Sequence, residues 1–324
     1  MSERNRLVAG VRSADRRLLA KAITLAESTR SDHQALARDV MAELLPQTGK
    51  ALRMGITGSP GVGKSTLIEA LGLHLIGEGH RVAVLAVDPS SSVSGGSVLG
   101  DKTRMNELSR NEHAFIRPSP ASGALGGVAA RTREAMLFAE AAGFDVVIVE
   151  TVGVGQSETD VADLTDVFVL MQLPHAGDDL QAMKKGVVEL ADIVVYNKRD
   201  LDQRAADIAM KQMEGALTLL RRHSKSWTPV VLGASALHRE GIDQLWSAVT
   251  RCRDALASSG ELQEKRTRQA VAWTWHLIDA ALRERFRNDT EVRNALPTVL
   301  RDVEAGTLTP TAAAAQLLST SKGE

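Results

Sequence analysis

Cysteine is almost absent from this chain, in which Cys252 is the only one among 324 residues. A single thiol excludes an internal disulfide and cannot build a thiolate zinc cluster, so the sequence suits a reducing compartment. No apolar run approaches the length of a membrane span, and the charged start of the chain has no apolar signal core. We therefore expect a cytoplasmic protein with no membrane partner.

An excess of positive charge is missing as well. Lys+Arg 39 are balanced by Asp+Glu 40, which leaves a formal net charge of -1. Proteins that bind nucleic acid through its phosphates usually carry a basic excess, so we expect no nucleic-acid partner. The content of 44% hydrophobic and 24% charged residues is instead typical of a globular domain with a sizeable core.

Short apolar runs alternate with helix-length segments through the middle of the chain. These runs are Arg53–Thr57, Val82–Val87, Asp145–Val149, Val167–Leu173, Ile193–Tyr196 and Val230–Leu232. Strands that are buried on both faces are apolar throughout rather than alternating. The pattern therefore predicts a doubly wound α/β fold, with a mostly parallel sheet covered by helices on both faces.

Helical periodicity flanks this block at both ends. The N-terminal part shows two amphipathic helical stretches between Ser13 and Leu45. The segment after Cys252 also reads as helical and carries an apolar stripe made of Trp273, Trp275, Leu277, Ile278 and Leu282. We expect an N-terminal helical extension over residues 1–50, a phosphate-loop domain over 51–252 and a helical arm over 253–324.

A glycine-rich segment between the first apolar run and a helical stretch has the spacing G-x-x-x-x-G-K-[ST]. Its residues are Gly58, Ser59, Pro60, Gly61, Val62, Gly63, Lys64 and Ser65, followed by Thr66. Backbone N–H groups in such a loop converge on phosphate oxygens, and the following helix adds its positive dipole end. We expect Lys64 to bridge the β- and γ-phosphates, Ser65 to ligate Mg²⁺ and Thr66 to contact the α-phosphate.

Two later segments indicate which base is bound. Asn197, Lys198 and Asp200 have the N-K-x-D spacing of the base-reading element of GTPases. A carboxylate at this place accepts hydrogen bonds from guanine N1–H and the 2-amino group, donors that adenine lacks. The S-A-x turn, whose backbone N–H contacts guanine O6, follows as Ser235, Ala236 and Leu237. The sequence thus predicts GTP and GDP as ligands.

Acidic residues at the ends of predicted strands indicate a metal site. Glu150 follows a buried run, and the segment from Glu150 to Gly153 stands in the place of the D-x-x-G motif, with Glu for Asp. Open α/β sheets bind ligands at this end of their strands. We expect Glu150 to hold Mg²⁺ together with Ser65, and Asp88 and Asp101 are further candidates.

The residues expected to act in hydrolysis depart from the Ras pattern. Gly153 is expected to sense the γ-phosphate through its N–H, as in other GTPases. Ras-like proteins place a glutamine directly after this glycine to orient the attacking water, whereas this chain has Val154 there and Gln156 two residues later. We therefore expect slow intrinsic hydrolysis by Lys64, Glu150 and Gln156, accelerated by a partner that reshapes this segment.

Taken in order, these motifs resemble those of the MeaB-type GTPases of the SIMIBI class, also labelled ArgK or amino-acid transport ATPases. The blocks that carry the resemblance are ITGSPGVGKST, VDPSS, GGSVLGDKTRM, VIVETVGVGQSE and NKRD. The resemblance implies a homodimeric GTPase that is a chaperone for adenosylcobalamin-dependent methylmalonyl-CoA mutase, gating cofactor delivery and protecting the mutase from inactivation. It also implies that the helical arm from Asp254 onward forms the dimer.

Three other functions stay open on the residues alone. A metallochaperone GTPase for nickel would need a set of Cys and His ligands, whereas this chain has one Cys and scattered His residues. A kinase that phosphorylates a transport-related acceptor would need a base or acceptor residue, for which His175 is the candidate. A partitioning ATPase would carry a second lysine early in the phosphate loop, where Ser59 and Pro60 stand.

Overall fold

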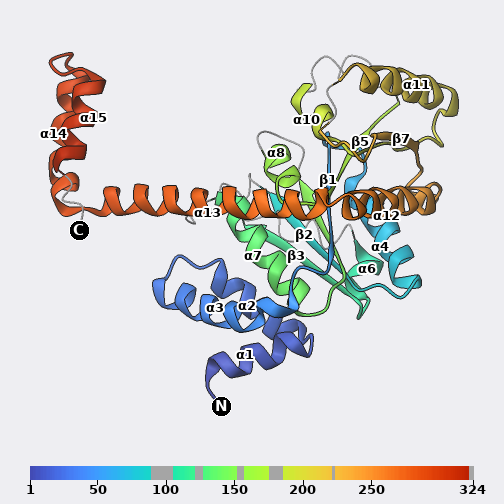
Figure 1. The fold of residues 1–324 in the computed structure, drawn as a ribbon, viewed down its shortest axis with the longest axis horizontal. Coiled ribbons are helices and arrows are strands. Elements are labelled where there is room, and N and C mark those ends of the chain that lie inside the picture. Colours follow the sequence, from blue (N-terminus) through green and yellow to red (C-terminus); the bar gives the residue numbers. More distant parts are fainter. Residues whose placement is uncertain (89–104, 121–126, 152–156, 175–184, 221–222, 321–324) are drawn as a thin grey trace. The chain divides into compact units, whose positions relative to one another are not determined.

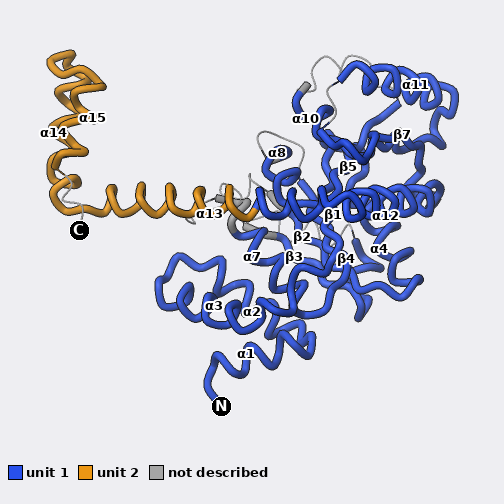
Figure 2. Tube along the Cα trace, viewed as in Figure 1, with its two compact units in different colours: residues 1–269 blue, residues 270–324 orange. Residues whose placement is uncertain are grey.

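The computed structural model describes residues 1–88, 105–120, 127–151, 157–174, 185–220 and 223–320. The chain forms two compact units, residues 1–269 and 270–324 (Figure 2). The first unit is built on a seven-stranded parallel sheet (Figure 1). The expected boundaries at residues 50 and 252 separate functional parts of the chain rather than compact units, and they stay a prediction.

The sheet confirms the doubly wound prediction. In spatial order its strands are β3 (Ala114–Pro120), β2 (Val82–Asp88), β4 (Val146–Thr151), β1 (Leu52–Gly58), β5 (Val167–Gln172), β6 (Ile193–Tyr196) and β7 (Val230–Gly233). All except β3 coincide with the predicted apolar runs to within two residues at each end. β1 lies between β4 and β5, where the direction of winding reverses, and open α/β sheets bind ligands at such a point.

The expected strands do not include β3. This strand carries Arg117, Pro118 and Pro120, and prolines are rare in interior strands because they cannot donate to the ladder. β3 pairs with β2 alone and lies at the edge of the sheet, where proline is tolerated. Arg117 forms an ion pair with the buried Glu27, so its charge faces a partner rather than an apolar core.

Helices cover both faces of the sheet. One face packs against α4 (Lys64–Gly77), α6 (Asn106–Arg110) and α12 (Ile242–Ser258). The other packs against α7 (Gly127–Ala141), α8 (Ser157–Ala162), α10 (Lys185–Leu190) and α11 (Gln203–Leu219). Because successive side chains of a strand alternate, Ile148 of β4 faces the first layer and Val149 the second.

The N-terminal extension has one more helix than expected. It consists of α1 (Glu3–Arg12), α2 (Arg16–Ala26), α3 (Ser31–Leu44) and the short 3-10 helix η1 (Leu45–Gln47). Asp15 caps α2 by accepting hydrogen bonds from the N–H groups of Arg17 and Leu18. Leu7, Val8 and Val11 form the buried face of α1. The three helices lie beside α7 (Figure 1) and share one hydrophobic core with it.

Helix α13 (Glu261–Asn288) begins in the first unit, where buried charges anchor it. Arg266 donates to both carboxylate oxygens of Asp166, at 2.8 and 2.6 Å, and to the carbonyl oxygen of Ala51 at 2.8 Å. Asp166 is fully buried, and a buried carboxylate is tolerated only when it is paired in this way. The first turns of α13 are thereby tied to the starts of β1 and β5.

The second unit contains the rest of α13 with α14 (Thr290–Glu304) and α15 (Pro310–Thr320). A small core joins the last two helices and is made of Val292, Val299, Ala313 and Leu317. On α13, exposed apolar residues follow a spacing of four, three and four: Val271 (54%), Trp275 (62%), Ile278 (40%) and Leu282 (56%). Of the helices that the structure describes, none is long and apolar enough to span a membrane.

Candidate nucleotide site

The phosphate loop joins the end of β1 to the start of α4. Gly58, Gly61 and Gly63 have φ angles of +151°, +82° and +99°, a region that L side chains rarely adopt. Gly63 is the N-cap of α4 and has no side chain that could accept hydrogen bonds from the first N–H groups of the helix. These N–H groups can therefore bind an anion such as a phosphate. The Lys64 ammonium donates to the carbonyl oxygens of Gly58 (2.8 Å) and Ser59 (3.2 Å) and so lies within the loop.

Asn197 connects the phosphate loop to both base elements. Its side-chain amide donates to the carbonyl oxygen of Val62 at 2.8 Å, and its side-chain oxygen accepts from the N–H of Ala236 at 3.0 Å. The residue is buried, with 2% of its surface exposed. A Cβ added at Gly63 would meet the Asn197 side-chain nitrogen at 2.5 Å, so this glycine is what lets the asparagine approach.

Lys198 and Asp200 are the other residues of the N-K-x-D element that the sequence assigns to the base. Lys198 has a φ of +60°, and its ammonium donates to the carbonyl oxygen of Gly61 at 2.9 Å. Asp200 is exposed, and the His238 ring lies 3.7 Å from its carboxylate. The nearby Ser235 hydroxyl is the main cause that holds the pKa of Asp200 below its usual value, and the residue's own backbone N–H and the charge of Lys198 act in the same direction. The carboxylate is therefore ionised at neutral pH and can accept two hydrogen bonds.

The Ser235 turn has a fixed backbone and two contrasting side chains. The N–H and carbonyl of Ser235 exchange hydrogen bonds of 3.0 Å with those of Glu240, which closes the turn. The buried Ser235 hydroxyl has no hydrogen-bond partner of ordinary geometry among the described residues, so it acts on Asp200 as a nearby dipole. Leu237 is 75% exposed beside this turn, and such an apolar side chain offers a surface on which a base could lie.

Two oxygen-bearing side chains meet where a metal ion is expected. The Ser65 hydroxyl donates to a carboxylate oxygen of Glu150 at 2.9 Å, and Glu150 is 7% exposed. Mg²⁺ prefers oxygen ligands and is usually held by one or two protein groups, phosphates and waters, so this pair fits the ion. Asp101, Gly153, Gln156, His175 and the side chain of Asp88 lie outside the described residues.

The sequence motifs did not single out a pair of buried threonines beside the site. The hydroxyl oxygens of Thr57 and Thr151 lie 2.7 Å apart, and both residues are fully buried. Thr57 precedes the first glycine of the phosphate loop, and Thr151 follows Glu150 directly. A threonine at the end of each of two strands is the signal in the sequence, but only the pairing of β1 with β4 brings them together.

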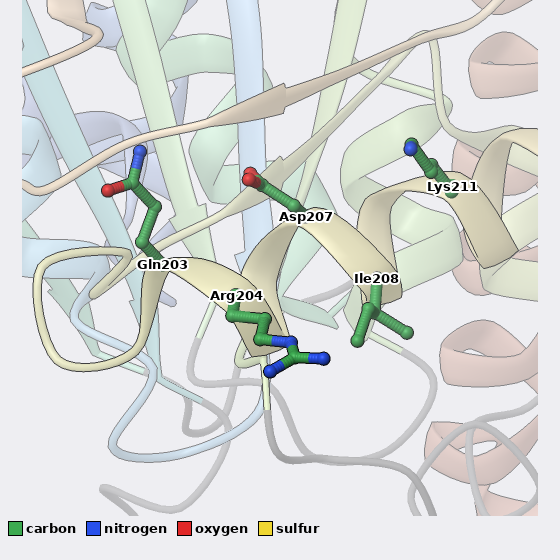
Figure 3. Close-up of a pocket in the computed structure, with 5 residues that line it drawn as sticks. All are labelled: Gln203, Arg204, Asp207, Ile208 and Lys211. Carbon is green, nitrogen blue, oxygen red and sulfur yellow. The ribbon is translucent and has the colours of Figure 1, made fainter.

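A hollow of about 500 Å³ lies along α11, directly after the N-K-x-D element in the chain. It is lined by Gln203, Arg204, Asp207, Ile208 and Lys211, and Figure 3 shows that these five side chains leave the same helix on two sides. None of them belongs to the predicted nucleotide site. This hollow is therefore separate from the predicted nucleotide site, whose described residues lie at the ends of β1, β4 and β6.

A central parallel strand that leads into a phosphate loop, with an N-K-x-D asparagine bonded to that loop, defines the class of phosphate-loop GTPases. Within this class, the chain belongs to the family described as Methylmalonyl Co-A mutase-associated GTPase MeaB, whose model matches residues 19–291. This confirms the family that the sequence motifs indicated.

Similar proteins agree with this family. The chain is 50% identical over 309 residues to the GTPase ArgK of Escherichia coli, covering 95% of this chain and 93% of that protein. It is 45% identical over 329 residues to the mitochondrial methylmalonic aciduria type A homolog of Mus musculus, covering 98% and 79%. A crystal structure of a LAO/AO transport system kinase has 40% identity, a TM-score of 0.78 and 98% coverage of both chains. The protein binds guanine nucleotides and is a GTP hydrolase.

Proposed function

We propose that this GTPase is a chaperone for adenosylcobalamin-dependent methylmalonyl-CoA mutase, and that its GTP cycle gates cofactor delivery and protects the mutase from inactivation. The family match over residues 19–291 carries the proposal, because the description of that family names the mutase. The similarity to the methylmalonic aciduria type A homolog over 98% of this chain supports it. The single cysteine and the likeness to a bacterial GTPase fit the cytoplasmic location that we propose.

In this cycle we assign Mg²⁺ to Ser65 and Glu150, with Asp88 and Asp101 as further candidates. The ion would neutralise charge on the phosphates, and Lys64 would add its ammonium to the same oxygens. Gly153 and Gln156 would sense the γ-phosphate and orient the attacking water. The hydrogen bond of 2.9 Å between Ser65 and Glu150 supports the metal assignment, since it places two hard oxygen ligands side by side.

Purified mutase tests the proposed partner. We expect the mutase to co-elute with this protein when a non-hydrolysable GTP analogue is present, and to raise the single-turnover rate of GTP hydrolysis by about tenfold or more. A cobalamin-dependent mutase of another substrate class is the control and should do neither. Rapid hydrolysis by the isolated protein, unchanged by the mutase, would contradict the proposal.

We also propose that the helical arm forms a homodimer. The exposed residues Val271, Trp275, Ile278 and Leu282 have the heptad spacing of a helix that packs against another helix. Charges placed in such a seam are costly to bury, so the combined change Trp275→Lys and Leu282→Lys should give a monomer in light scattering. Leu219→Lys changes an apolar residue that is 87% exposed on α11, and this control should stay dimeric. A monomeric unaltered protein at micromolar concentration would refute the proposal.

A second candidate function is phosphotransfer, which is favoured by the likeness to the LAO/AO transport system kinase at 40% identity. GTP labelled at the γ-phosphate separates the two activities, because a kinase leaves the label on an acceptor and a hydrolase releases it as phosphate. We expect the label to be released in full in the presence of the mutase.

A further inference from the structure

The end of β4 is bonded to the phosphate-loop strand by more than the backbone ladder. The hydroxyl oxygens of Thr57 and Thr151 lie 2.7 Å apart, and neither residue has any exposed surface. Each threonine is next in the chain to a residue of the nucleotide site, Gly58 in one case and Glu150 in the other. A shift in the position of either threonine therefore also shifts the neighbouring residue of the nucleotide site.

This hydroxyl pair and the metal pair lie on opposite faces of the sheet. Glu150 is directed to the α4 layer, where it meets Ser65, and side chains of a strand alternate, so Thr151 is directed to the layer of α7 and α8. The end of β4 is thus held to β1 and its loop on both faces. A hydrogen bond on one face limits how far the strand can twist or slide on the other.

Close packing leaves little room for the pair to adjust. Gly55 is two residues before Thr57 and faces the same layer, and a Cβ there would meet Val161 of α8 at 2.8 Å and Phe168 at 2.9 Å. Two hydroxyl oxygens approach to about 2.7 Å, whereas methyl groups pack at about 3.5–4.0 Å. Loss of the hydrogen bond would therefore displace the strand end by about 1 Å, on the scale that matters for a ligand geometry.

We propose that Thr57 and Thr151 are a positioning pair, which sets the place of Glu150 against Ser65 and thereby the strength with which the GTPase retains Mg²⁺ and its nucleotide. This inference rests on the proposed assignment of Mg²⁺ to Ser65 and Glu150. The threonines act through their chain neighbours, so their contribution is to geometry rather than to a direct contact with the ion.

Valine substitutions separate positioning from stability. Thr57→Val or Thr151→Val alone leaves one buried hydroxyl without its partner, which lowers the melting temperature. The double change leaves no polar group unpaired, so it should cost less stability than either single change, and the loss that remains comes from fitting two methyl groups into the same space. If the pair only satisfied two buried hydroxyls, the double variant would keep the Mg²⁺ dependence of the unaltered protein.

The test is the dissociation rate of a fluorescent GDP, measured against Mg²⁺ concentration together with the melting temperature. We expect the double valine variant to melt at a higher temperature than either single variant and yet to need about 3- to 10-fold more Mg²⁺ for half-maximal retention, the factor that one hydrogen bond supports. Dissociation in a chelator should be unchanged. The separate substitutions Thr57→Ser and Thr151→Ser keep the hydroxyls, so these variants should have the Mg²⁺ dependence of the unaltered protein.

Thr165→Val is the matched control. Thr165 is also fully buried, and its hydroxyl donates to the carbonyl oxygen of Val161 at 2.8 Å rather than to a group on β4. A double valine variant with the original Mg²⁺ dependence would overturn the inference, and so would an equal shift caused by Thr165→Val. Ser65→Ala identifies the other failure: if it leaves the Mg²⁺ dependence unchanged, the metal assignment itself is wrong and the positioning role falls with it.

Discussion

Asp200→Asn is expected to lower the affinity for GDP by about a thousandfold or more and to raise the affinity for xanthosine diphosphate. The pKa of Asp200 is held below its usual value, so the carboxylate is ionised and can accept from guanine N1–H and the 2-amino group. An asparagine amide would set its own donors against those of guanine, and a site built for hydrogen bonds rejects a mismatched partner strongly. Xanthine has a carbonyl in place of the 2-amino group and can accept from the amide. Titration of the two fluorescent diphosphates measures both changes.

The control for this exchange is Asp207→Asn on α11. Asp207 bonds to Arg199 of the same N-K-x-D element at 3.0 Å, so the substitution makes the same chemical change close by. It should leave the preference for guanine intact. If Asp200→Asn keeps that preference as well, guanine is not read by this carboxylate and the site has been assigned to the wrong ligand.

Gly63→Ala is expected to weaken GDP binding by at least about a hundredfold. The φ of +99° disfavours an L side chain, at a cost of about 1–3 kcal/mol. The new Cβ would also meet the Asn197 side-chain nitrogen at 2.5 Å. Asn197 must then move, and its hydrogen bonds to Val62 and Ala236 are broken together. Calorimetric titration of the purified variant with GDP gives the loss directly.

Gly61→Ala separates the contribution of the clash from that of the strain. Gly61 has a φ of +82°, but a Cβ added there meets no atom within 4 Å. The control should therefore lose about tenfold in affinity, from backbone strain alone. Equal losses for the two variants would show that contact with Asn197 does not matter to the binding of the nucleotide.

The nucleotide motifs could be predicted from the sequence because each one is a short segment with its own spacing. The phosphate loop and the N-K-x-D element both lie at the ends of strands whose apolar runs are continuous. The bridging role of Asn197 could not be predicted in the same way. It bonds to Val62, 135 residues earlier in the chain, and only the order of strands in the sheet brings the two together.

Other features depend on packing that local patterns do not report. β3 is an edge strand with two prolines, so its composition favours a loop more than a strand. The pairing of Thr57 with Thr151 depends on the register between β1 and β4. Helix α1 is short, and its apolar residues begin only at Leu7, so they become a signal only when their buried partners are known.

The N-terminal helices share a core with α7, and this has a consequence for biosynthesis. Helix α3 ends at Leu44 and α7 ends at Ala141, so about a hundred residues separate the first helices from the surface that they cover. At about 5–20 residues per second, a ribosome needs about 5–20 s to add that length. During this delay, the apolar residues of α1, α2 and α3 that later pack on α7 stay open to other nascent chains and to folding helpers.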